Sequence, residues 1–92
     1  MLYRDEVIKI RHHAFGSFYE LLIKDRKYSI SDRLFEILVE KTPKERIEFE
    51  LDNWGTRIPF SLREAGISIY RLHFALCQVY TEEQKKLALF AK

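Results

Sequence analysis

The chain has one cysteine, three glycines and two prolines among its 92 residues, and each scarcity excludes a class of structure. A single cysteine, Cys77, cannot form an internal disulfide, so packing alone has to hold the fold, as is usual in reducing compartments. We therefore expect a cytoplasmic protein. The sequence contains no linker, repeat or low-complexity segment rich in glycine, proline or serine. We expect residues 1–92 to form a single domain.

The sequence also lacks a long hydrophobic run. Its most apolar stretch, 67–80, is interrupted by Arg71, His73 and Gln78, and it is shorter than the roughly 20 residues of a membrane-spanning helix. Residues 1–6 already include charged side chains from position 4 onward, and they lack the apolar run and the cleavage site of a secretion signal. We expect no membrane partner.

The chain also lacks a large excess of charge of one sign. Sixteen Lys and Arg against fourteen Asp and Glu give a net charge of +2, far from the dense positive charge of a strong nucleic-acid binder. The charge therefore permits a nucleic-acid role without requiring one. Hydrophobic residues make up 47% of the chain, which indicates a domain that folds without a partner.

Residues 6–30 have the pattern of strands. Apolar and basic residues alternate imperfectly over 7–11, residues 14–17 offer a turn, 18–23 are rich in β-favouring side chains, and 24–27 form a polar hairpin loop. This pattern predicts a three-stranded antiparallel meander. Helical spacing fits the same apolar residues, so an all-α helical bundle is the alternative.

The middle of the chain favours helices. Ser31 can cap a helix over 32–41, and the capping box 42–45 predicts a second helix that runs to about Trp54. The alternation of Ile47, Phe49 and Leu51 with acidic residues is also typical of an edge strand.

The strongest periodic signal lies near the C-terminus. After the capping box 61–64, apolar residues recur at alternating steps of three and four: Leu62, Ala65, Ile69, Leu72, Leu76 and Val79. A second apolar row runs beside them, made of Ile67, Tyr70, Phe74 and Cys77. This predicts a central helix over about 61–80, which must be buried on several sides. We also expect a short helix that begins at a capping box over 81–84. The expected fold is α+β, with the N-terminal meander packed by helices.

No group of residues predicts catalysis or metal binding. His12 and His13 are adjacent, so they cannot point at one metal ion, and no further Cys or His completes a ligand set. His73 and Cys77 lie four residues apart among apolar rows, which favours an inert buried thiol. Phosphate-binding glycine loops are absent from the sequence. We expect no cofactor and no enzymatic activity, and a hydrolase or nuclease that uses the histidines ranks last.

The excess of apolar helical surface predicts a small intracellular binding or regulatory module. It would act through protein–protein contacts, with another protein or with a second copy of itself. The residues expected at such an interface are Trp54, Ile69, Phe74 and Leu76.

Residues 62–72, with sequence LREAGISIYRL, favour a different hypothesis. They resemble the helix-turn-helix pattern, in which a short helix ends at a glycine and a second helix enters the major groove. The resemblance implies a DNA-binding transcriptional regulator that uses residues 61–76. It implies DNA contacts for these residues: Arg63, Ser68, Tyr70, Arg71 and His73. The alternative is an uninterrupted core helix that contains Gly66.

Trp54, with Phe49, Phe60 and Tyr70, also offers an aromatic patch for a partner or for unpaired bases, and Lys24, Arg26 and Lys27 could supply charge. The alternative is that these aromatic residues fill the core.

Overall fold

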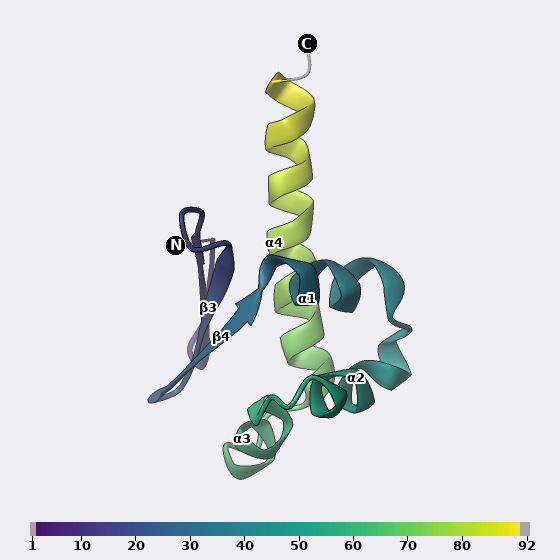
Figure 1. The fold of residues 1–92 in the computed structure, drawn as a ribbon. Coiled ribbons are helices and arrows are strands. Elements are labelled where there is room, and N and C mark those ends of the chain that lie inside the picture. The colour runs from purple at the N-terminus through teal and green to yellow at the C-terminus, as the bar shows by residue number, and fades with distance from the viewer. Residues whose placement is uncertain (1, 91–92) are drawn as a thin grey trace.

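The computed structural model describes residues 2–90 and shows an antiparallel sheet followed by helices, with a long helix at the C-terminal end (Figure 1). The predicted α+β fold is confirmed, and the all-α alternative is wrong. The four strands are paired in chain order. Their bounds are β1 Tyr3–Arg4, β2 Ile8–His13, β3 Phe18–Ile23 and β4 Arg26–Ser31.

Both predicted hairpin turns are present. The turn over 14–17 joins β2 to β3, with His13 opposite Phe18. The next turn is shorter than expected, because Ile23 pairs with Arg26 and only two residues connect the strands. Lys24 adopts a positive φ of 54° to close this tight connection.

A fourth strand, β1, was not predicted, and Asp5 holds it against β2. The Asp5 carboxylate accepts hydrogen bonds from the backbone N–H groups of Val7 and Ile8, both at 2.7 Å, and from the Tyr3 hydroxyl at 2.8 Å. Partial burial would raise the pKa of Asp5, but these donors together outweigh it and lower the pKa. A single side chain therefore fixes this turn.

The predicted helix over 32–41 is confirmed. It consists of α1 Asp32–Glu36 and a wider π-type turn, η1 Ile37–Lys41. The Ser31 hydroxyl accepts a hydrogen bond from the N–H of Leu34 at 3.0 Å, as a capping serine should.

The helix expected next is also present, as α2 Ile47–Asn53, so the edge-strand alternative is wrong. Its predicted cap is not used. Thr42 ends the preceding turn in an extended conformation, and a short 3₁₀ helix, η2 Lys44–Arg46, leads into α2.

The helix predicted over 61–80 is divided in two. Residues 61–64 belong to α3 Ile58–Glu64, and a new helix, α4 Ile69–Phe90, begins after a turn. Gly66 has a φ of +71°, which a residue inside a right-handed helix does not adopt, and this conformation ends the first helix. Ser61 lies inside α3 and is buried, so it does not cap a helix. The helix start expected over 81–84 is also wrong, because α4 continues through it.

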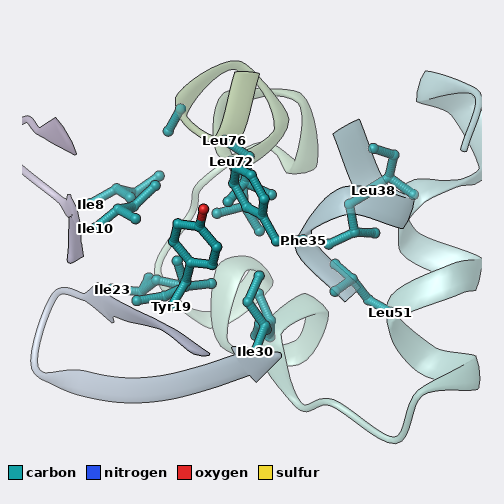
Figure 2. Close-up of a cluster of buried hydrophobic side chains, with 14 of the residues drawn as sticks. Ile8, Ile10, Tyr19, Ile23, Ile30, Phe35, Leu38, Leu51, Leu72 and Leu76 are labelled. Carbon is teal, nitrogen blue, oxygen red and sulfur yellow. The ribbon is translucent and has the colours of Figure 1, made fainter. Parts of the chain in front are cut away.

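The helices cover one side of the sheet (Figure 1). Strand residues on that side, including Ile10 and Tyr19, point toward Leu72 and Leu76 of α4, and α1 adds Phe35 to the same cluster (Figure 2). The last turns of α4 extend beyond this packed region (Figure 1). A two-layer arrangement of this kind leaves the second face of the sheet to water.

The substitution Gly66→Ala tests the division between α3 and α4. An L-residue at a φ of +71° is strained, so we expect the free energy of unfolding to fall by about 1 kcal/mol in chemical denaturation. In a continuous helix the same change would raise it by about 1 kcal/mol, because alanine is the better helix former. A stabilised variant would therefore contradict the division.

Candidate functional site

The turn between α3 and α4 has a glycine and a serine at the places where the helix-turn-helix pattern has them. Gly66 supplies the positive φ, and the Ser68 hydroxyl accepts a hydrogen bond from the N–H of Tyr70 at 3.1 Å. The Tyr70 ring is exposed, and the Lys44 ammonium lies 5.0 Å from its centre. The sequence pattern therefore located this turn correctly.

Two of the predicted DNA-contacting cations are paired with carboxylates. Arg63 lies 3.4 Å from Glu48, and Arg71 lies 3.6 Å from Asp5. The pair of Arg63 and Glu48 joins two exposed groups, so it is weak and can exchange for a phosphate, whereas Asp5 is partly buried. The two side chains nevertheless do not form a purely basic surface.

His73 contacts Cys77 as the spacing of four residues predicted, with 3.4 Å between Nε2 and Sγ. Burial lowers the pKa of His73 and raises the pKa of Cys77. Both shifts favour neutral groups near pH 7, whereas a catalytic pair needs the thiolate.

The four predicted interface residues are not equally accessible. Trp54 is 42% exposed and Phe74 is 56% exposed, whereas Ile69 is half-buried beside a hollow of about 200 Å³ at the start of α4. Leu76 is fully buried against the sheet and takes no part in any surface. The predicted interface included residues from two faces of α4. The sheet covers the face that carries Leu76, so only the other face is at the surface.

Large exposed hydrophobic side chains concentrate on α2, α3 and the first turns of α4. We call this surface the aromatic end of the molecule. Charged groups of both signs lie beside its rings: Arg46 lies 5.0 Å from the centre of the Phe49 ring, and the Glu50 carboxylate accepts a hydrogen bond from the Trp54 indole. Its members are Phe49, Trp54, Phe60, Tyr70 and Phe74.

A second candidate site surrounds His12, on the side of β2 that faces α4. The two histidines lie on opposite faces of the strand, as predicted. The His12 ring stacks on Tyr19, and its nitrogens lie 3.1 Å from Asp32 and 3.6 Å from Glu83. The two carboxylates contact different nitrogens of one ring, so they do not converge on a common point where a metal could bind. No group of His, Cys, Asp and Glu among residues 2–90 is arranged to hold a metal ion.

Glu83 joins this cluster to the core. It accepts a hydrogen bond of 2.6 Å from the Tyr19 hydroxyl, and burial together with this bond raises the pKa of Tyr19. A hollow of about 400 Å³ opens beside the cluster, and Glu40 and Tyr80, which are hydrogen-bonded to each other, lie on its wall. The polar groups around His12 satisfy one another, so the arrangement ties α4 to the sheet.

Two features of the sequence indicate this cluster. His12 follows Ile8 and Ile10 at the even spacing of one strand face, so it should point toward the core. Glu83 continues the spacing of Leu76 and Val79 along α4 by a further four residues.

Comparison with known proteins finds no match to this chain: no protein-family model, curated protein or solved structure is similar to it. Among residues 2–90, no helix combines the length and the apolar character needed to cross a membrane.

The contact between Tyr19 and Glu83 makes the folded state less stable as the pH rises into the alkaline range. Because the folded state raises the pKa of Tyr19, ionisation of the phenol above about pH 10 favours the unfolded chain. We expect the free energy of unfolding to fall above pH 10. Tyr19→Phe should remove part of this fall and cost about 1 to 3 kcal/mol at pH 7. Equal alkaline slopes for the variant and the wild type in denaturant titrations would contradict the assignment.

Proposed function

We propose that the protein is a small non-enzymatic binding module that acts through protein–protein contacts at its aromatic end, beginning with a second copy of itself. The observation that carries the proposal is the exposure of five large aromatic side chains on neighbouring helices. Aromatic residues are enriched in the centres of protein interfaces, because they bury much area at little cost in conformational entropy. We also propose a cytoplasmic location, because a chain with a single cysteine has no internal disulfide, as is usual in reducing compartments.

The charges around these rings favour a second copy as the partner. In a two-fold symmetric contact the same surface meets itself, so a patch of one sign would repel its copy. The aromatic end instead carries both signs close together, with Lys44 and Arg46 beside Tyr70 and Phe49, and Glu48 and Glu50 on the same helix, α2. Basic groups of one protomer can therefore meet acidic groups of the other.

The substitution Phe74→Ser tests self-association at this surface. We expect the molar mass of the wild type, measured by light scattering, to rise toward twice that of the protomer as concentration increases. Loss of one large aromatic contact should weaken the dimer by about tenfold or more. Phe15→Ser is the matched control, because Phe15 is a fully exposed phenylalanine in the β2–β3 turn, outside the aromatic end.

Two outcomes would overturn the proposal. One is a wild type that stays monomeric at the highest attainable concentration. The other is an equal dissociation constant for the two serine variants. Because Phe74 is exposed, circular dichroism should show that both variants keep the fold.

The turn at Gly66 supports a second candidate function, binding of duplex DNA through the start of α4. This function predicts an affinity that falls steeply as salt rises and a loss of binding in Arg71→Ala with the fold intact. Arg33→Ala, which removes an exposed cation of α1, serves as the control. If duplex fragments show no binding at low salt, this candidate is wrong.

A further inference from the structure

The face of the sheet that points away from the helices has a composition unlike the rest of the molecule. We call it the open face. Alternation along each strand assigns residues to it: Lys9 and Arg11 lie between the buried Ile8, Ile10 and the core-facing His12. The other strands place their outward residues beside them through the observed register. The members are Arg4, Lys9, Arg11, His13, Phe18, Glu20, Leu22, Lys27, Ser29 and Ser31.

The open face is strongly basic. Arg4, Lys9, Arg11 and Lys27 contribute four positive charges against the single carboxylate of Glu20, whereas the whole chain has a net charge of only +2. The remainder of the molecule therefore carries a net negative charge. Such a separation of charge attracts an anionic partner to one side of the protein.

Glu20 offsets part of this positive charge, and both of its oxygens are engaged on the open face. One lies 2.6 Å from Nε2 of His13 and the other lies 3.5 Å from Lys27. The hydrogen bond with His13 lowers the pKa of Glu20, so the carboxylate stays ionised and keeps the His13 ring in place.

Three of the four cations form a row that crosses the whole sheet. Arg4 pairs with Lys9, Lys9 with Leu22, and Leu22 with Lys27. Neighbouring strands are about 4.8 Å apart, so the row spans about 14 Å. This is long enough to contact several consecutive phosphates of an extended chain.

Aromatic rings lie at the other end of the same face. His13 and Phe18 stack with their ring centres 4.7 Å apart and their planes 14° from parallel. The Phe18 ring lies across the β2–β3 turn, where a Cβ at Gly16 would be 2.5 Å from it. At this turn Phe15 is fully exposed to water. The turn therefore presents a fixed ring pair and one free ring beside a basic surface.

We propose that the open face binds single-stranded nucleic acid. The row of Arg4, Lys9 and Lys27, with Arg11 next to it, contacts the phosphates, and bases stack on Phe15 and on the pair of His13 and Phe18. Single strands expose the faces of their bases to such rings, and stacking on aromatic side chains is how many single-strand binders hold them. The bases of a duplex are already stacked inside the helix. This surface is separate from the aromatic end, so the proposal does not depend on self-association.

The test is fluorescence anisotropy of labelled oligothymidine and oligouridine with the purified full chain, over a series of salt concentrations. We expect saturable binding that weakens as salt rises. The double variant Lys9→Gln, Arg11→Gln should lower the affinity by about tenfold or more and reduce the slope of log affinity against log salt by about 1.4. Phe15→Ala should lower the affinity by about fivefold or more and leave the slope unchanged.

The controls separate a specific face from general charge. Arg33→Gln and Lys86→Gln remove exposed cations from helices and should bind as the wild type does. All these positions are on the surface, so melting curves should confirm an intact fold.

Several results would overturn the proposal. The first is no binding of the oligonucleotides at low salt. The second is an affinity for a duplex of the same length equal to that for the single strand, and the third is binding to vesicles of phosphatidylserine as strong as binding to the single strand. An unchanged affinity in Phe15→Ala, or an equal loss in the control variants, would also contradict it.

Discussion

The packing of α4 lengthwise against one face of the sheet is the interaction on which the rest of the structure depends. Leu72, Leu76 and Val79 are fully buried, and the strand residues opposite them form the other half of the core (Figure 2). Truncating one such leucine costs about 2 to 5 kcal/mol, a large part of the roughly 5 to 15 kcal/mol that stabilises a domain. Because this contact uses one face of α4 and one face of the sheet, each element leaves its other face at the surface. The helical surface carries aromatic rings with charges of both signs, and the sheet carries cations. The aromatic end therefore suits contact with a second copy of the chain, whereas the open face suits an anionic partner.

The sequence predicted the element types well because hydrophobic periodicity and local hydrogen bonds determine them. The strands of the meander, the helix capped by Ser31 and the helix of α2 all follow from nearby residues. The expected fold carried one helix across Gly66, because the spacing of Leu62, Ala65 and Ile69 continues across it, and only the resemblance to a helix-turn-helix indicated a break there. Apolar spacing records which residues face the core, and two helices joined by a tight turn can share that core as well as one helix can. The short strand β1 was missed because it depends on local hydrogen bonds of the Asp5 carboxylate, which leave no apolar periodicity in the sequence.

The candidate sites were harder to predict than the fold. The α3–α4 turn was located from residues 62–72, but the pairing of Arg63 and Arg71 with carboxylates depends on chain segments far away in sequence. Leu76 was assigned to an interface because the sequence could not show which apolar row the sheet would cover. The open face was missed for a similar reason. Arg4, Lys9 and Lys27 are scattered along the chain, and only strand register brings them into one row.

The central claim is that the helices cover one face of the sheet and leave the other to water. Leu21 and Leu22 are adjacent on β3 and point to opposite faces, Leu21 being fully buried. Each can be replaced by cysteine in a Cys77→Ser background, and the rate of thiol modification under native conditions can be measured. The structure predicts that the thiol of Leu22→Cys is modified rapidly in the folded protein. The thiol of Leu21→Cys should be modified only when the protein unfolds, at the rate of unfolding. Equal protection, or equal reactivity, of the two thiols would contradict it.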